Sequence, residues 1–175
     1  MLSLLPHPDF PSVAVTAIAV DINRRVRGEL VLRYQVSGDL DGVIWPSLDG
    51  KTARVDGLWE HTCFEAFVGF ADAPDYCELN FAAAKWAAYR FDDYRTGARD
   101  LKRVTQHGHW VAGIGLAVVH VMLPDLDKPR DWRLGASVII EAKDGSKSFW
   151  ALKHPKGKPD FHHPDCFAAR IAAPA

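Results

Sequence analysis

Residues 28–36, GELVLRYQV, decide the fold class, because apolar and polar side chains alternate along them with the period of a β-strand. One face of such a strand carries four apolar side chains: Leu30, Leu32, Tyr34 and Val36. The opposite face is polar except for Val31. The stretch therefore predicts a strand that buries one face and turns the other toward solvent.

Further segments are short and rich in residues that favour strands: 12–20, 61–70, 76–81, 85–91, 109–123, 133–142, 148–152 and 166–172. Turn-forming stretches separate them, and Asp144-Gly145 is typical of a tight hairpin turn. Residues 80–91, NFAAAKWAAYRF, also offer a helical interpretation, because their alanines favour helix. β-Forming residues at both ends, and no capping Ser or Asp at the start, favour a strand there as well.

About nine short strands separated by turns predict an all-β protein, specifically an antiparallel β-sandwich of immunoglobulin-like or jelly-roll-like type. We expect a single domain over residues 1–175, since no repeat, low-complexity tract or linker divides the chain. Residues 1–11 contain three prolines and are expected to form a loose segment that runs along the surface.

Charge and composition exclude several classes of partner. The formal net charge of -1 gives no general electrostatic reason to expect nucleic acid or an anionic membrane. No apolar run approaches the ~20 residues that span a bilayer. The first residues lack the basic region of a signal peptide. Three cysteines without a CxxC spacing favour reduced thiols, and together these features predict a cytoplasmic protein.

Two glutamates lie inside predicted strands, where an unpaired buried carboxylate would be unfavourable. Glu65 lies in 61–70 and Glu78 in 76–81. If residues 71–75 close this hairpin without a bulge, the two glutamates occupy opposite faces of the sheet. A register shifted by one residue sets Glu65 opposite Asn80 and brings both carboxylates and Asn80 to one face. Both registers are compatible with the sequence.

The segments WEHTCFEAFVG (59–69), YCELNF (76–81) and WAAYRFDDYR (86–95) resemble DOMON-like domains related to the family-9 carbohydrate-binding modules. Those domains carry a Trp–x5–Glu–x–Phe strand, a hairpin, and a strand with a polar residue before a hydrophobic–Asn step. The segment SFWALKHPKGKPDFHHPDCFAARI (148–171) resembles the end of a bacterial DOMON-like subgroup. The resemblance covers most of residues 28–172 and implies a β-sandwich.

For the site, the resemblance implies a sugar held between aromatic rings, with carboxylate and amide groups on its hydroxyls. Trp59 and Glu65 match the first pattern, and Glu78 matches the polar position of the next strand. Asn80 and, as a second ring, Trp150 complete the expected ligand-binding set. These residue types suit a pyranose, whose apolar C–H face packs on a ring while its rim needs hydrogen bonds. The alternative is that the tryptophans belong to the core or to a protein interface.

Residues 154–165, HPKGKPDFHHPD, raise the possibility of a metal site with Asp160, His162 and His154 as ligands. The adjacent His162 and His163 point apart in an extended chain, which favours instead an ordered loop that leads into the last strand. Haem binding would draw its axial ligands from Met122, His120, His61 and His154. His120 and Met122 are too close along one strand to bracket an iron.

The preferred hypothesis is non-catalytic binding of a carbohydrate or another small polar ligand, without a cofactor. A module that binds another protein, or that forms a homo-oligomer, is the main alternative, with the tryptophans as interface anchors. A glycosidase that uses Glu65 and Glu78 is a further alternative, since such enzymes need two carboxyls about 5–10 Å apart.

Overall fold

The computed structural model describes residues 1–48, 50–101 and 104–174 and confirms an all-β protein. Its strands are β1 (Leu2–Pro6), β2 (Val15–Asn23), β3 (Glu29–Gly38), β4 (Ala53–Arg54), β5 (Cys63–Phe70), β6 (Tyr76–Ala82), β7 (Lys85–Phe91), β8 (Arg99–Asp100), β9 (Thr105–Val111), β10 (Leu116–Met122), β11 (Trp132–Glu141), β12 (Lys147–Ala151) and β13 (Ala169–Ile171). Short 3-10 turns connect some of them: η1 (Leu40–Gly42), η2 (Leu58–Glu60), η3 (Ala112–Ile114), η4 (Pro124–Leu126) and η5 (Pro164–Cys166).

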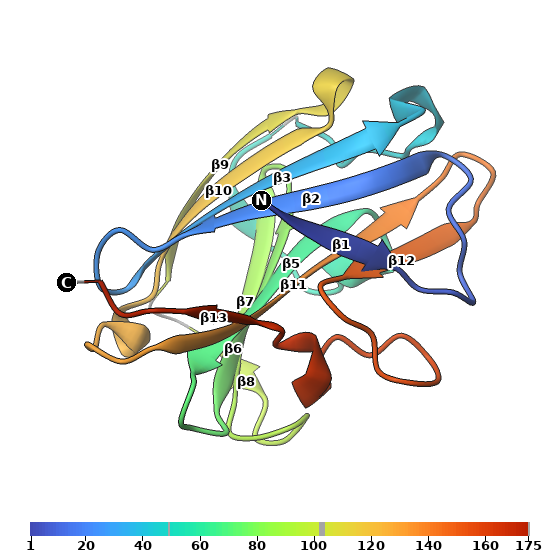
Figure 1. Ribbon diagram of the computed structural model, residues 1–175. Helices are drawn as coiled ribbons and strands as arrows, with labels where there is room; N and C mark the ends of the chain where they lie inside the picture. Colours follow the sequence, from blue (N-terminus) through green and yellow to red (C-terminus); the bar gives the residue numbers. More distant parts are fainter. Residues whose placement is uncertain (49, 102–103, 175) are drawn as a thin grey trace.

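The strands form one continuous, curled sheet in the order β4-β7-β6-β5-β11-β12-β1-β2-β3-β10-β9, with β13 beside β11 and β8 beside β7. Among the described residues every pairing of named strands is antiparallel except that of β4 with β7. In Figure 1 the half with β2, β3, β9 and β10 lies over the half with β5, β6, β7 and β11. The expected sandwich and the expected number of about nine strands are not confirmed, because the described strands form a single sheet that folds over itself.

Strand β1 corrects the prediction that residues 1–11 form a loose segment. Its first half pairs with β2 and its second half pairs with β12, so this strand joins the two halves of the sheet. Leu4 is only 3% exposed and packs in the core. Pro6 is the last residue of the strand, a position where proline is tolerated, and the next backbone N–H, that of His7, donates to the carbonyl oxygen of Phe149 at 2.8 Å.

Residues 109–123 form a hairpin rather than the single strand expected from their apolar content. β9 and β10 are joined by η3, and Gly115 closes the turn in the left-handed conformation with φ 64°. A Cβ at Gly115 would lie 2.2 Å from the carbonyl oxygen of Val36, so only glycine fits this turn. The predicted Asp144-Gly145 hairpin is confirmed between β11 and β12, and residues 85–91 form β7 rather than a helix.

The main core lies between the two halves of the curled sheet and explains which face of each strand is apolar. The alternating residues predicted to be buried in β3 are fully enclosed, and Tyr34 donates its hydroxyl hydrogen to the backbone oxygen of Glu65. From β5 the core receives Phe64, Ala66, Val68 and Phe70. The intervening residues of β5 point to the other face of the sheet, where a second cluster of buried aromatic side chains lies.

The described part of the chain contains no helix with the length and apolar character needed to cross a bilayer.

Candidate functional site

The register of the β5–β6 hairpin brings both glutamates to one face of the sheet. Glu65 pairs with Asn80, and Phe67 pairs with Glu78. Of the two registers compatible with the sequence, this is the one shifted by one residue from the hairpin without a bulge. The next strand continues the row, since Tyr89 of β7 lies opposite Glu78. Because side chains alternate along a strand, Glu65, Glu78, Asn80 and Tyr89 all leave the sheet on the face away from the main core.

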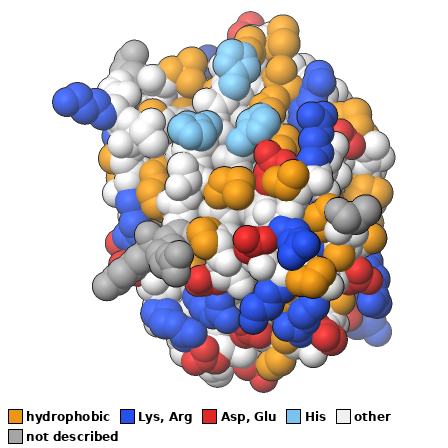
Figure 2. All heavy atoms as spheres, turned by 90° about the vertical axis from the view of Figure 1, so that its left-hand side faces the viewer, with side chains coloured by type: hydrophobic (Ala, Val, Ile, Leu, Met, Phe, Trp, Pro, Cys, Tyr) orange, Lys and Arg blue, Asp and Glu red, His pale blue; other side chains and the backbone are white. Residues whose placement is uncertain are grey.

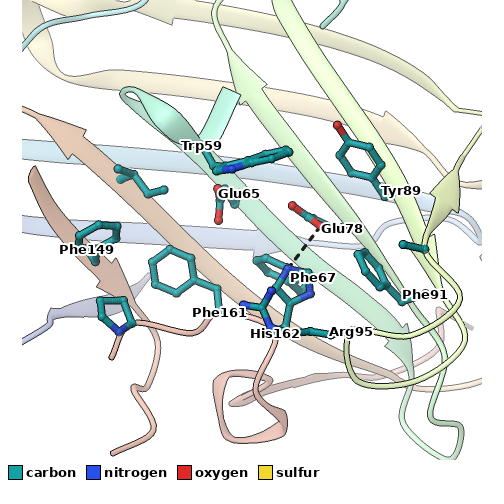
Figure 3. A pocket seen from close by; sticks show the side chains of 13 residues that line it. Trp59, Glu65, Phe67, Glu78, Tyr89, Phe91, Arg95, Phe149, Phe161 and His162 are labelled. Carbon is teal, nitrogen blue, oxygen red and sulfur yellow. Dashed lines mark ion pairs between the residues drawn. The ribbon is translucent and has the colours of Figure 1, made fainter. Parts of the chain in front are cut away.

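A pocket of about 500 Å³ lies over this face, a volume suited to a small ligand. Its floor comes from β5, β6, β7, β11 and β12, and its sides come from η2, the turn after β7 and the loop 154–165 (Figure 3). It is lined by Trp59, Glu65, Phe67, Glu78, Tyr89, Phe91, Arg95, Ala98, Ile139, Phe149, Pro159, Phe161 and His162. The lining is mainly aromatic, with two carboxyl groups among the rings.

Trp59 supplies an accessible aromatic ring at the edge of the pocket. It lies in η2, which begins after Gly57 in the left-handed conformation with φ 77°. The indole is 42% exposed and contacts the Tyr89 ring edge to face, at 6.1 Å between ring centroids. The Tyr89 hydroxyl donates to Asp56, which fixes the second ring. A large ring that stays exposed while its neighbour is held in place can pack against the apolar face of a ligand.

Glu65 is the most deeply buried charged group of the pocket, at 2% exposure. Its Oε2 accepts a hydrogen bond of 3.1 Å from the Ser137 hydroxyl on β11. Burial, followed by the charge of Glu78, raises the pKa of Glu65 to about 8, and the Ser137 hydrogen bond acts in the opposite direction. The carboxyl is therefore mainly protonated at pH 7 and can both donate and accept hydrogen bonds.

Glu78 shares the face with Glu65 but has a different set of partners. Asn80 donates from Nδ2 to Oε1 of Glu78 at 2.8 Å, and its own Oδ1 has no protein partner in the described structure. Burial raises the pKa of Glu78, with the Asn80 hydrogen bond acting in the opposite direction. Asn80 is fully buried and does not line the pocket, so it holds Glu78 in position.

His162 brings the loop 154–165 into the pocket wall. Its Nδ1 lies 2.8 Å from the Tyr76 hydroxyl, and its Nε2 lies 3.6 Å from Oε2 of Glu78, the contact dashed in Figure 3. Burial, followed by the positive charge of Arg95, lowers the pKa of His162 to about 4. The ring is therefore neutral at pH 7. If Tyr76 donates to Nδ1, the proton of the ring lies on Nε2 and points toward Glu78.

Asp160 fixes this loop against the turn that follows β7. Its carboxylate accepts hydrogen bonds from the Tyr94 hydroxyl at 2.5 Å, from Arg95 Nη2 at 2.7 Å and from the backbone N–H of His162 at 3.2 Å. The expectation of an ordered loop before the last strand is thus confirmed. The loop also has a role that the sequence did not reveal, because it contributes Phe161 and His162 to the pocket.

Trp150, like Asn80, is a predicted site residue that does not line the pocket. It is 3% exposed, packs in the main core on the opposite face of β12, and donates from its indole to the Ser148 hydroxyl at 3.0 Å. Its neighbour Phe149 faces the pocket instead. The second-ring prediction was displaced by one position along the strand, because the register of β12 cannot be read from its short sequence.

The metal and haem alternatives find no ligand set among the described residues. Asp160 and His162 are engaged as above, and His154 Nε2 bonds the backbone oxygen of Leu5 at 2.8 Å. No group of three or more His, Cys, Asp or Glu in the described ranges is arranged to hold a metal ion. Figure 2 shows histidines gathered on one surface of the molecule; on β9 and β10 the exposed ones are His107, His109 and His120.

The haem candidates face no common cavity. His120 and Met122 are exposed on the outer face of β10, and Met122 is 42% exposed. His61 pairs with Glu141 at 2.7 Å, on an exposed part of the surface. These side chains therefore cannot supply two axial ligands to one iron.

Tyr89, Phe91, Phe149, Phe161 and Arg95 also line the pocket but were not predicted as site residues. The strand period could have found Tyr89 and Phe91, since both lie on the Glu78 face once the β6–β7 hairpin is aligned. The loop residues carry no such signal, because a loop has no fixed period.

Comparison with known proteins shows that the chain is similar to a solved structure. Neither a family model nor a curated protein matches the chain. Among solved structures, a protein from Bacteroides uniformis described as "a putative carbohydrate-binding protein" superposes with a TM-score of 0.63. The alignment covers 94% of this chain and 81% of the other, at 15% sequence identity. The chain thus shares its overall fold with that protein.

Proposed function

We propose that the chain binds a carbohydrate in the pocket over β5, β6 and β7, as a binding protein rather than an enzyme. The observation that carries the proposal is the combination of one exposed tryptophan ring with two buried carboxyls inside a single pocket of about 500 Å³. Trp59 packs against the C–H face of the sugar, and Glu65 and Glu78 hydrogen-bond its hydroxyls. The fold shared with the Bacteroides uniformis protein supports the same ligand class.

Each carboxyl of the pair is held by a neighbouring polar side chain, Glu65 by the Ser137 hydroxyl and Glu78 by the Asn80 amide. Burial raises the pKa of both carboxyls. The pair is thus suited to exchange hydrogen bonds with hydroxyls, which both donate and accept.

We also propose that the chain is a DOMON-like domain of the kind related to family-9 carbohydrate-binding modules. Trp59 and Glu65 support this, since they match the Trp–x5–Glu spacing of the resemblance and both line the pocket.

Titration with a panel of mono- and oligosaccharides, followed by calorimetry and tryptophan fluorescence, tests the binding proposal. We expect at least one sugar to bind, and Trp59→Ala to weaken it by about tenfold or more. Trp45→Phe is the matched control, because Trp45 is partly buried against the main core and donates to the backbone oxygen of Leu40, away from this pocket. If no sugar of the panel binds, or if the Trp59→Ala variant binds a sugar as tightly as the unmodified protein does, the proposal is contradicted.

A further inference from the structure

We propose that the preferred ligand is a cationic sugar, a pyranose that carries a protonated amine, with its ammonium group between Glu65 and Glu78. This inference deepens the proposed function and rests on it. It follows from the charges that face the pocket, from the aromatic side chains around them and from the buried polar groups that have no other positive partner.

The charge balance of the pocket leaves a place for one cation. Among the described residues neither Lys nor Arg forms an ion pair with Glu65 or Glu78. Arg95 lines the pocket and its charge lowers the pKa of Glu78, but the guanidinium forms its ion pair with Asp160, at 2.7 Å. His162 reaches Glu78 as a neutral ring. Among the described residues, the two carboxyls therefore line a pocket in which no Lys or Arg forms a direct ion pair with them.

The aromatic lining favours the same ligand charge. Rings present their negative faces to a cation, and such contacts strengthen where water is excluded. Trp59, Tyr89, Phe91, Phe149 and Phe161 all line the pocket around the two carboxyls (Figure 3). A neutral sugar would use the rings through its C–H face alone. An amino sugar would make two kinds of contact with the rings, because its C–H face packs against one ring while its ammonium group lies near the face of another.

Proton balance gives the inference a distinctive signature. In the empty pocket at pH 7 Glu65 holds its proton; when an ammonium group arrives, the carboxyl ionises, the proton passes to solvent, and the ammonium takes its place. Binding should then release between zero and one proton per ligand. A neutral sugar leaves the carboxyl protonated and releases none, because it offers no charge to stabilise the carboxylate.

Other titratable groups near Glu65 do not supply this proton. Burial raises the pKa of the Cys63 thiol and of the Tyr34 hydroxyl well above their ordinary values, with the charge of Glu65 as the next cause. Burial, followed by the hydrogen bond to Asp56, also raises the pKa of Tyr89 well above its ordinary value, so its hydroxyl stays protonated. His162 is already neutral at pH 7 and has no proton of a charged ring to lose. The released proton is thereby assigned to the two carboxyls.

Calorimetry at pH 7 in two buffers of different ionisation enthalpy tests the inference, with five probes. These are glucosamine, glucose, N-acetylglucosamine, glucuronic acid and choline. Glucosamine differs from glucose by one amine, and N-acetylglucosamine keeps the nitrogen but loses its charge. We expect glucosamine to bind roughly tenfold tighter than glucose or N-acetylglucosamine, with proton release. Glucuronic acid should bind weakest of the sugars, because its carboxylate meets two acidic groups.

Glu65→Gln and Glu78→Gln should each reduce the preference for glucosamine over glucose, and Glu65→Gln should abolish most of the proton release. Glu29→Gln makes the same chemical change on β3, outside the pocket, and should leave preference and proton release unchanged. Glucose binding as tightly as glucosamine would overturn the inference and leave the proposed function intact. If no sugar binds, or choline alone binds, both fail.

Discussion

Trp59 and Trp150 show how one residue type serves two purposes in this molecule. Trp59 is 42% exposed in a 3-10 turn, whereas Trp150 is 3% exposed in the main core. Replacing an exposed ring removes little buried surface, but replacing an enclosed one leaves a cavity and, here, an unpartnered Ser148 hydroxyl. The stability effects of the two substitutions should therefore differ sharply.

We expect Trp59→Ala to change the free energy of unfolding by less than about 1 kcal/mol, and Trp150→Ala to lower it by roughly 3–5 kcal/mol. Urea unfolding followed by circular dichroism measures both values. A large loss for Trp59→Ala would mean that its ring is part of the folded core. In that case any loss of sugar binding by this variant would report unfolding rather than lost contact.

Site residues could be predicted where the strand pattern alone shows which face of the sheet a side chain occupies. They could not be predicted where that face depends on contacts between distant segments. The two glutamates were singled out because a carboxylate inside an apolar strand demands an explanation. The choice of register depended on how the β5–β6 loop closes, which the sequence leaves open. Phe149 and Trp150 are adjacent and point to opposite faces of β12. An error of one residue in the register therefore decides which of them is assigned to the pocket and which to the core.

At the scale of elements, β1 is the clearest departure from expectation. Its sequence, LSLLP, is too short and too rich in leucine to predict a strand, and further prolines follow closely. Position in the sheet decides its structure instead, because the free edges of β2 and β12 both accept its backbone hydrogen bonds. Tertiary pairing thus overrides a weak local propensity.

We expect Leu4→Ala to lower the free energy of unfolding by about 2–4 kcal/mol, because the Leu4 side chain is buried in the core at the junction of the two halves. Leu5→Ala is the matched control, since Leu5 is 53% exposed on the same strand. The control should change stability by less than about 0.5 kcal/mol. Equal losses for the two variants, measured by denaturant unfolding, would show that β1 does not join the halves through Leu4.

The loop 154–165 makes a separate prediction about ligand binding. Asp160→Ala removes the carboxylate that accepts from Tyr94, Arg95 and the His162 backbone, so Phe161 and His162 should lose their fixed place in the pocket wall. We expect faster hydrogen exchange at residues 161–163 and about tenfold weaker sugar binding. Asp165→Ala is the control in the same loop, because Asp165 is half exposed and its carboxylate contacts Lys153 at 3.4 Å. Unchanged affinity in Asp160→Ala would exclude the loop from the binding site.

For the molecule as a whole, the all-β class follows from alternation alone, but the joining of both halves into one sheet does not. Alternation tells which side of a strand is buried, and it does so correctly for β3. It does not tell which strands are neighbours, and the link through β1 arises from pairings far apart in the chain, such as Leu5 with Ala151. The pocket could not be predicted for the same reason, because its walls come from segments that become neighbours only through the order of strands in the sheet.

The buried titratable groups of the pocket predict how the stability of the whole molecule varies with pH. Glu65 has its pKa raised to about 8, so between its unfolded value of 4.5 and pH 8 the folded state holds a proton that the unfolded state has released. The contribution of Glu65 to the stability of the folded state is therefore complete below pH 4.5, and it is lost as the pH rises through 8. His162 has its pKa lowered to about 4 from 6.5, so its contribution is present above pH 6.5 and is lost as pH falls toward 4.

These two effects oppose each other between pH 4.5 and 6.5, and between pH 6.5 and 8 the loss from Glu65 is no longer offset by His162. In that upper window we expect the free energy of unfolding to fall by up to ~1.4 kcal/mol per pH unit. Glu65→Gln, which keeps the shape but cannot ionise, should flatten this slope, whereas Glu29→Gln on the outer face of β3 should retain it. Urea unfolding at half-unit steps of pH measures the three curves. A Glu65→Gln curve parallel to that of the unmodified protein would show that Glu65 is ionised in the folded state at pH 7, and that its charge is already compensated.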